Sequence, residues 1–297
     1  MNSKIFVLLI LTSLLVNCTK EKDSDKDELS CNAIPNSQTI VHDGLNREYI
    51  TYVPSSYDGN TAVPLLFNFH GFGGRADEYM SYANMRTQAD SGNFILVYPQ
   101  GSCLNGSSHW NASLLGPGNK STTDDFGFIE ALINKLSTSY NVDSTRIYAC
   151  GYSNGGMFAY ALACYESNLI AGVSSVSGCM LDINCSPSHP TAVLAIHGTS
   201  DDVLPYNGNS SYNSVATAVD YWKAHNNTDT SPIINSVVDN GTTIEHHLYA
   251  NGDSSVTVEH YKVIGGVHDW FNLNYNGNNT GDLIWNYVSQ YDIYGKR

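Results

Sequence analysis

Short apolar runs alternate along the chain with segments whose apolar residues recur at helical spacing. Nearly continuous runs are typical of strands buried on both faces of a sheet, and we expect such strands at residues 64–70, 94–98, 170–176 and 191–197. Helical spacing predicts helices at residues 76–91, 125–140, 211–225 and 280–291. This alternation predicts a single α/β domain, with a mostly parallel central sheet and helices on both faces.

Weaker patterns extend this sheet. Residues 38–54 alternate between polar and apolar positions around an Asp-Gly turn, so we expect an antiparallel hairpin there. Residues 242–250 and 256–264 are also strand-like. The stretch 101–124 is rich in Gly, Ser and Asn, and an irregular loop of this length inside a compact domain is usually functional or disordered.

One pentapeptide stands between a predicted strand and a predicted helix. Residues 146–150 are apolar enough for a buried strand, and residues 156–164 suit a helix. Between them lies Gly151-Tyr152-Ser153-Asn154-Gly155. A Gly-x-Ser-x-Gly sequence in this context resembles the nucleophile elbow of α/β-hydrolases, whose glycines permit a sharp turn that exposes the serine hydroxyl. The alternative is an ordinary Gly/Ser turn, since the chain holds 25 glycines.

A serine hydroxyl becomes an effective nucleophile only when a base removes its proton. In the α/β-hydrolase fold the chain order is serine, then Asp or Glu, then histidine. Asp201 follows a strong predicted strand and His268 follows the last one, so both are expected at the same sheet edge as Ser153. Spacing does not exclude Asp202, whereas Asp269 is badly placed to orient the ring of its own neighbour.

Such chemistry also needs donors for the negative charge that develops on the substrate oxygen. The fold draws one donor from the residue after the nucleophile, here Asn154, and one from the loop after an early strand. That loop is the glycine-rich turn 70–74, in which the backbone N–H of Phe72 is the expected donor. His70, at a strand end before glycine, is expected to brace the turn.

The charge balance argues against a nucleic-acid partner. The 297 residues include 28 Asp and Glu against 14 Lys and Arg, a formal net charge of −14, whereas phosphate backbones demand a basic patch. Charged residues are only 14% of the chain, and Tyr, Asn, Ser and Gly are plentiful, which suits an exported protein with neutral, hydroxyl-rich or aromatic ligands. No C-x-x-C pair or histidine cluster indicates a metal, and we expect no cofactor.

The N-terminus has the pattern of an export signal. An apolar run over residues 5–16 is too short to span a bilayer and predicts a signal peptide over residues 1–17. The run ends in a sequence that resembles a bacterial lipobox, with Cys18 as the residue that would carry the lipid. Asn17 departs from the small residue that is usual there, and ordinary secretion with cleavage nearby is the alternative.

The segment that follows the predicted signal peptide begins without apolar residues. We expect residues 18–36 to form a flexible acidic and lysine-rich tether, and residues 37–297 to form the catalytic domain. The acidic stretch resembles the surface-export signals of Bacteroidetes-type lipoproteins. Contact with a membrane is therefore expected only through a lipid anchor, at the outer membrane or cell surface.

Six cysteines remain besides Cys18, and an even number fits a compartment that permits disulfides. They are Cys31, Cys103, Cys150, Cys164, Cys179 and Cys185. Cys179 and Cys185 are close in sequence across a loop-like segment and are the expected bridge. Cys31 with Cys103 is a second possible pair, and Cys150 and Cys164 are interpreted as buried thiols.

Six motifs in combination resemble one family. They are the segments 70–74, 98–101, 142–148, 151–157, 197–201 and 265–270. Together they resemble the polyhydroxybutyrate depolymerase and feruloyl esterase group, the carbohydrate esterase family 1 type of α/β-hydrolase, over nearly all the chain from about residue 38. This resemblance implies a triad of Ser153, Asp201 and His268. Phe271 is a departure, because many members have proline there, and this implies a changed pocket wall rather than changed chemistry.

The resemblance implies an exported serine carboxylic-ester hydrolase that works through an acyl-enzyme. With no residues left for a polymer-binding domain, we favour a feruloyl or acetyl esterase of plant polysaccharide over a depolymerase of short polyhydroxyalkanoate esters. An exported peptidase would usually need an added domain. The non-enzyme alternative is a glycan-binding lipoprotein on an inactive scaffold. Trp110, Tyr206 and Trp270 are candidate walls for an aromatic or sugar ring, or else they fill the core of their loops.

Overall fold

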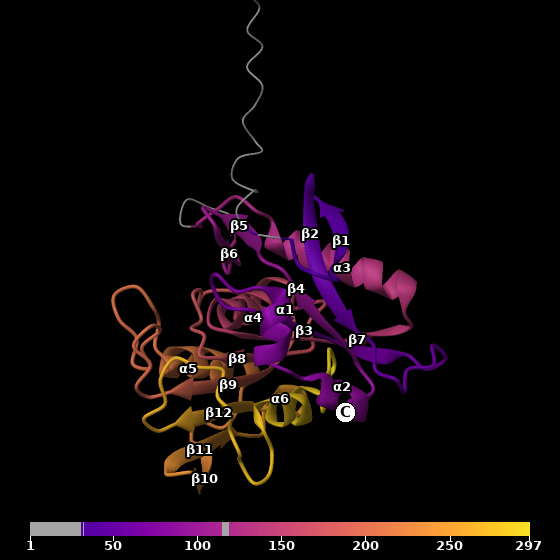
Figure 1. Ribbon diagram of the computed structural model, residues 1–297. Helices are drawn as coiled ribbons and strands as arrows, with labels where there is room; N and C mark the ends of the chain where they lie inside the picture. The colour runs from indigo at the N-terminus through magenta and orange to yellow at the C-terminus, as the bar shows by residue number, and fades with distance from the viewer. Residues whose placement is uncertain (1–30, 32, 115–118) are drawn as a thin grey trace, which may run out of the picture.

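A ten-stranded sheet runs through the middle of the molecule (Figure 1), in the computed structural model that describes residue 31 and residues 33–114 and 119–297. In spatial order its strands are β1 (Gln38–His42), β2 (Leu45–Tyr52), β4 (Ile95–Pro99), β3 (Val63–Phe69), β7 (Val142–Tyr152), β8 (Gly172–Val176), β9 (Ala192–Gly198), β12 (Val258–Val263), β11 (Thr242–Tyr249) and β10 (Ile233–Asp239). Strands β4 to β12 in this order are parallel, and the outer strands pair antiparallel. The predicted, mostly parallel sheet is confirmed.

Helices cover both faces of this sheet. They are α1 (Ala76–Tyr82), α2 (Arg86–Gly92), α3 (Asp125–Ser139), α4 (Asn154–Tyr165), α5 (Val215–Asn226) and α6 (Thr280–Val288). Helices α3, α4 and α5 contribute Phe128, Phe158 and Trp222 to an apolar core on one face. Helices α1 and α6 contribute Tyr79 and Ile284 to a second core on the other face. The described chain therefore has the predicted single-domain α/β architecture.

One predicted helix is divided in two. The sequence predicted a helix over residues 76–91, but the chain breaks between α1 and α2. The side chain of Asn84 accepts a hydrogen bond from the N–H of Arg86 (3.1 Å), which competes with helical pairing. The buried hydroxyl of Tyr98 donates to the carbonyl of Ala83 (2.8 Å), so the break leaves this carbonyl satisfied.

The edge strand β10 was missed because its apolar residues do not alternate with polar ones. Ile233, Ile234 and Val238 are 57%, 55% and 71% exposed, since an edge strand without a helix above it does not need a buried face. The turn that joins this strand to β11 nevertheless has a sequence that is typical of a hairpin. Asn240 and Gly241 join β10 to β11 with positive φ of 46° and 83°, which is the favoured chemistry of a two-residue hairpin.

Short hairpins appear in two places where the sequence predicted none. The expected irregular stretch 101–124 contains β5 (Ser102–Leu104) paired with β6 (Ser107–His109). Near the C-terminus the last helix ends at residue 288 rather than 291, and β13 (Tyr291–Asp292) pairs with β14 (Gly295–Lys296). The first of these hairpins lies against the glycine-rich turn after β3, where the N–H of Gly73 donates to Ser108 O.

Glycine permits a close approach where β7 turns into α4. A Cβ atom on Gly155 would overlap the carbonyl oxygen of Phe69 at the end of β3. A Cβ atom on Gly151 would lie 2.9 Å from the same oxygen. The two glycines therefore allow the first turn of α4 to rest directly on β3, which fixes the residue between them, Ser153.

The disulfide prediction for Cys179 and Cys185 is wrong. Cys185 is bonded to Cys164, and Cys179 is a buried free thiol. Cys164 is on α4, so the bridge ties the loop after β8 to that helix, whereas short separation along the chain had favoured the nearer cysteine. The second pair, Cys31 with Cys103, is present, and Cys150 is a buried thiol as expected.

The N-terminal expectations mostly fall outside the described residues. The signal peptide over residues 1–17, the lipidation of Cys18 and most of the tether over residues 18–36 lie there. The last part of that tether packs on the domain: Ile34 is only 5% exposed, and its N–H donates to Glu48 Oε1 (3.0 Å). Among the helices in the described part of the chain, none has the length and apolar character that crossing a membrane requires.

We predict the disulfide connectivity of the oxidised protein. Digestion with proteases that cut before Asp and after Glu separates Cys164, Cys179 and Cys185, because Glu166 and Asp182 lie between them. Mass spectrometry without reduction is expected to find Cys164 linked to Cys185, and Cys179 alkylated only after unfolding. A peptide that links Cys179 to Cys185 would contradict this pairing.

A second prediction concerns the packing of α4 on β3. Gly155→Ala is expected to lower the free energy of unfolding by about 1–3 kcal/mol or more, because the new methyl group overlaps the Phe69 carbonyl. Gly172→Ala is the matched control, since its Cβ would meet Ala192 Cβ at 3.3 Å, a milder contact. Denaturant unfolding of both variants measures the difference, and equal losses would show that the approach at Gly155 is not the tighter one.

Candidate active site

Ser153 occupies a sharp turn between β7 and α4. Its φ of 54° and ψ of −118° are rare for a residue with a side chain. The residue precedes α4 directly, so its hydroxyl stands at the N-terminal end of the helix. The side chain is partly exposed. This is the geometry that the Gly-x-Ser-x-Gly pattern predicted.

Three side chains from distant parts of the sequence meet at this turn. His268 Nε2 lies 2.9 Å from Ser153 Oγ, and His268 Nδ1 lies 2.7 Å from Asp201 Oδ2. Asp201 follows β9 and His268 follows β12, so each residue comes from the carboxyl end of a parallel strand. The structure thus brings together the serine, histidine and aspartate that the sequence singled out.

The surroundings of Asp201 keep it ionised. Burial would raise the pKa of this carboxyl, but hydrogen bonds from His197, His268 and the backbone of Leu204 outweigh burial and hold the pKa well below its usual range. His197 Nε2 lies 3.1 Å from Asp201 Oδ2, and the N–H of Leu204 donates to Oδ1 (2.8 Å). An ionised, immobile carboxylate beside Nδ1 fixes the tautomer of His268 in which Nε2 can accept a proton.

The neighbouring acids are engaged elsewhere. Asp202 is exposed to solvent. Asp269 Oδ1 accepts hydrogen bonds from the hydroxyl of Tyr82 and the N–H of Trp270. Of the three acids weighed in the sequence, Asp201 is the one bonded to His268.

The glycine-rich turn after β3 lies beside Ser153. A Cβ atom on Gly71 would lie 3.3 Å from Ser153 Cβ. Within the turn, the N–H of Gly73 donates to Ser108 O (2.8 Å) and the N–H of Gly74 donates to Gly71 O (3.0 Å). The N–H of Phe72 has no acceptor among the described residues. This N–H therefore stays the predicted donor to the oxyanion.

Asn154, the other expected oxyanion donor, has a fixed side chain. Its Oδ1 accepts from the N–H of Trp110 (2.8 Å), and its Nδ2 donates to the carbonyl of the same residue (3.0 Å). The backbone N–H of Asn154 belongs to the first turn of α4, where N–H groups lack intrahelical acceptors. The positive end of that helix points toward the serine.

His70 braces the turn, as expected. Burial lowers its pKa to about 4, so the ring is neutral near pH 7. Its Nε2 accepts a hydrogen bond from the N–H of Gly101 (2.9 Å), which leaves Nδ1 as the protonated nitrogen that donates to Gly71 O (2.7 Å). The histidine therefore locks the turn to the segment that follows β4.

Trp110 is not the exposed substrate wall that the sequence allowed. Its side chain is 2% exposed and stacks on Phe158, with ring centroids 5.1 Å apart and planes at 9°. Its Nε1–H donates to the carbonyl of His70 (3.0 Å). The alternative interpretation, a tryptophan that pins its loop to the core, describes this ring.

The other two aromatic candidates differ in accessibility. Tyr206 is half-buried, and its hydroxyl lies 2.8 Å from His260 Nε2. Trp270 is only 7% exposed but lines a pocket of about 380 Å³, together with the more exposed Tyr82 and the strained Phe271, whose φ is 61°. Trp270 is thus the candidate that borders a pocket, although neither Ser153 nor His268 lines that pocket.

Tyr152 was missed as a support of the histidine. Its hydroxyl donates to the carbonyl of His268 (3.2 Å), and the two ring centroids are 5.0 Å apart. Tyr152 lies inside the pentapeptide, directly before Ser153. The Gly-x-Ser-x-Gly pattern accepts any residue at this position, so nothing in the sequence indicated the contact with His268.

Among the described residues there is no cluster of His, Cys, Asp and Glu side chains that could hold a metal ion.

Comparison with known proteins agrees with this geometry. Residues 54–250 match the Abhydrolase_2 family, described as phospholipase/carboxylesterase. A protein named "Probable feruloyl esterase C" from Aspergillus oryzae is 31% identical over 207 residues, which cover 67% of this chain and 72% of that protein. A bifunctional acetylxylan esterase/xylanase from Neocallimastix patriciarum is 28% identical over 85% of this chain, which spans only 34% of that longer protein.

Solved structures share the fold at low sequence identity. An acetyl xylan esterase from Aspergillus awamori superposes with a TM-score of 0.58 at 16% identity, over 78% of this chain and 94% of that one. The feruloyl esterase module from Clostridium thermocellum gives a TM-score of 0.55 at 13% identity, over 87% of this chain and 86% of that one. The family match covers well over half of the sequence, and the chain belongs to the phospholipase/carboxylesterase family of α/β-hydrolases.

Proposed function

We propose that this protein is an exported serine carboxylesterase that removes feruloyl or acetyl groups from plant polysaccharide through an acyl-enzyme. The hydrogen-bonded series Ser153, His268, Asp201 carries the proposal, because it is the arrangement that activates a serine hydroxyl. The relatives named as feruloyl and acetylxylan esterases support the substrate class. Two disulfides fit an oxidising compartment. We further propose that a lipid on Cys18 anchors the protein to a membrane surface.

The proposed reaction assigns each step to a group of the candidate site. Ser153 Oγ attacks the ester carbonyl carbon while His268 Nε2 takes its proton. The oxyanion then accepts hydrogen bonds from the backbone N–H groups of Phe72 and Asn154, which are preorganised before the substrate arrives. When the intermediate collapses, His268 returns the proton to the departing alcohol oxygen and leaves an acyl-Ser153. A water molecule, deprotonated by His268, then attacks the acyl carbon. The bond from that carbon to Ser153 Oγ breaks, the carboxylic acid leaves, and His268 returns the proton to Ser153 Oγ.

The alternative substrates remain within the same mechanism. A depolymerase of short polyhydroxyalkanoate esters would use the same three residues, but neither relative described above carries that name. The non-enzyme alternative, a glycan-binding protein on an inactive scaffold, is disfavoured because the triad geometry and the available N–H of Phe72 are both intact.

The first test is hydrolysis of methyl ferulate and of a small acetyl ester by the purified protein. We expect turnover of at least one of them, and Ser153→Ala is expected to reduce kcat to about one part in 10⁴ or less, because the nucleophile is lost. Ser211→Ala, a change at an exposed serine, is the matched control. Labelling by a fluorophosphonate probe reports on the nucleophile independently of substrate, and folded protein that neither turns over ester nor labels at Ser153 would overturn the proposal.

The two adjacent aspartates provide a second, internally controlled test. Asp201→Asn is expected to lower kcat by roughly four orders of magnitude, because an amide stabilises the wrong tautomer of His268. Asp202→Asn removes the charge of the next residue, whose side chain is exposed. This variant is expected to keep kcat within about twofold of the wild-type value. Steady-state kinetics on one small ester compares the two. A large loss in Asp202→Asn with none in Asp201→Asn would reverse the assignment of the acid.

A further inference from the structure

A polar pocket lies over the last three strands of the sheet. Helix α6 packs on β8 and β9, and the face of β12, β11 and β10 beside it (Figure 1) is open as a pocket of about 550 Å³. A volume of this size is typical of sites that hold small molecules. None of Ser153, Asp201 and His268 lines this pocket, so it is not part of the candidate active site.

The register of the strands determines the floor of the pocket. Asn235 on β10 pairs with His246 on β11, and His246 pairs with Tyr261 on β12. Because side chains alternate between the two faces of a strand and paired residues share a face, these three side chains lie in one row on the same face. Val237 and Glu259, each two positions along its strand, point to that face as well. All five residues line the pocket.

The other walls come from α6 and from a tight turn before it. Asn276 and Gly277 have positive φ of 52° and 84°, which suits the two-residue turn that brings Tyr275 opposite Asn278. The side chain of Asn278 ties this turn to the helix, because its Oδ1 accepts from Asn286 Nδ2 (3.2 Å). The walls are therefore in place before a ligand binds, which lowers the entropic cost of binding.

Several polar groups in this pocket are free to bind a ligand. Within the described chain the hydroxyls of Tyr261 and Tyr275 have no hydrogen-bond partner, and neither hydroxyl is completely enclosed by protein. Gln290 donates from Nε2 to Asn286 O (2.8 Å), which leaves its Oε1 without a partner among the described residues. The exposed carboxamide of Asn235 is also unpaired there. Donors and acceptors that a ligand can reach therefore line the same space.

A cluster of three rings fixes the two tyrosine hydroxyls. The rings of His246 and Tyr261 stack with centroids 4.4 Å apart and planes at 12°, and Tyr275 meets Tyr261 edge-on at 5.1 Å. His246 Nε2 lies 2.7 Å from Glu259 Oε2, which holds the imidazole in this stack. Because these contacts restrict the rotation of both tyrosines, each hydroxyl has a fixed position in the pocket.

The residues that line the pocket favour a neutral ligand with many hydroxyl groups. No lysine or arginine is among them, so a phosphate or carboxylate finds no cation, and the single carboxylate is bonded to His246. Each hydroxyl of a sugar both donates and accepts, and a carboxamide matches it with a donor and an acceptor. Five carboxamides line the pocket: Asn235, Asn276, Asn278, Asn286 and Gln290.

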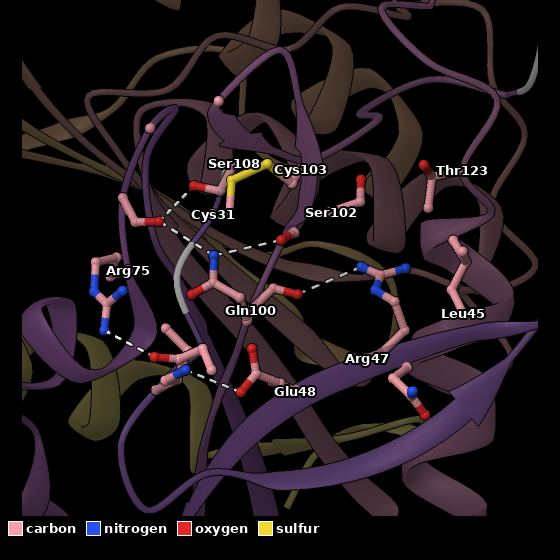
Figure 2. A pocket seen from close by; sticks show the side chains of 17 residues that line it. Cys31, Leu45, Arg47, Glu48, Arg75, Gln100, Ser102, Cys103, Ser108 and Thr123 are labelled. Atoms are coloured by element: carbon pink, nitrogen blue, oxygen red, sulfur yellow. Dashed lines mark hydrogen bonds between the residues drawn. A yellow bond between two sulfur atoms is a disulfide. The ribbon is translucent and has the colours of Figure 1, made fainter. Parts of the chain in front are cut away.

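A pocket beside the turn 71–74 differs in this respect (Figure 2). There, Gln100 Nε2 donates to Gly74 O (3.2 Å). Glu48 Oε1 accepts from the N–H of Ile34 (3.0 Å). Figure 2 shows these bonds within the wall itself. These polar groups are thus satisfied by the protein, whereas the groups over β10, β11 and β12 are open to a ligand.

We propose that the pocket formed by β10, β11, β12, α6 and the turn 275–278 binds a neutral sugar ring of a polysaccharide chain. The carboxamides and the hydroxyls of Tyr261 and Tyr275 bond to the ring hydroxyls, and no residue of this pocket takes part in ester cleavage. An extended peptide would instead pair with the free backbone edge of β10. The inference rests on the proposed function for the identity of the chain, a plant polysaccharide.

Three variants test the site. Asn235→Trp fills the pocket from an exposed position on β10. Ile234→Trp is the matched control, because this neighbouring residue is also exposed, at 55%, and points to the opposite face of the same strand. Tyr261→Phe removes a hydroxyl that has no partner in the described part of the chain and keeps the ring in its stack. Denaturant unfolding of each variant is measured first and is expected to match the wild type.

Binding is measured by native gel electrophoresis through soluble arabinoxylan, a neutral polysaccharide in which the formal charge of −14 drives migration. We expect arabinoxylan to slow the wild type and Ile234→Trp equally, and Asn235→Trp to migrate as it does in a gel without polysaccharide. Calorimetry with xylohexaose is expected to show a Kd about fivefold higher for Tyr261→Phe, because one hydrogen bond is lost. Wild-type mobility that arabinoxylan leaves unchanged, or equal slowing of Asn235→Trp and Ile234→Trp, would overturn the proposal.

These outcomes are separable from failure of the proposed function. Failure of the esterase proposal would appear as absence of Ser153-dependent turnover of methyl ferulate, a substrate without a sugar. The sugar site stands if arabinoxylan slows the wild type and Ser153→Ala but not Asn235→Trp, whether or not ester is cleaved. If methyl ferulate is cleaved while arabinoxylan slows none of the proteins, the esterase assignment stands and the sugar site is wrong.

Discussion

Helix α4 begins directly against the end of β3, and this contact determines where the candidate nucleophile stands. The carbonyl of Phe69 faces Gly151 and Gly155, and a side chain on either residue would push the helix away from the sheet. With the helix in place, Ser153 takes the rare backbone conformation that aims its hydroxyl out of the turn. The same contact places the first N–H groups of α4 beside the glycine-rich turn after β3. The candidate nucleophile and the proposed oxyanion donors therefore share one structural cause.

The carboxylate of Asp201, which bonds to two histidines, fixes the position of His268 in the site. Asp201 faces His268 on one side and His197 on the other, and backbone N–H groups complete its hydrogen bonds. Because the residue is buried, any loss of these partners would leave a charge without compensation. The motif that contains His197 and Asp201 thus encodes both the acid and the group that holds it, within five consecutive positions.

Patterns that reflect burial predicted most of the fold and the candidate triad. The parallel strands are apolar because they are covered on both faces, and the strand ends then locate Ser153, Asp201 and His268. Features that depend on contacts between segments far apart along the chain could not be predicted from the sequence. Cys185 pairs with Cys164 because α4 lies beside the loop after β8, which separation along the chain cannot reveal. Trp110 was ambiguous for the same reason, since Phe158 belongs to another element.

Strand β10 has a consequence for the behaviour of the protein in concentrated solution. It is an edge strand with exposed Ile233, Ile234 and Val238, and it carries no lysine or internal proline of the kind that blocks pairing with another chain. The formal net charge of −14 opposes close approach of two copies through long-range repulsion. Salt shortens the range of that repulsion to about 8 Å at physiological ionic strength. We therefore expect charge repulsion to oppose association of two copies, while this edge of the sheet remains open to a further strand.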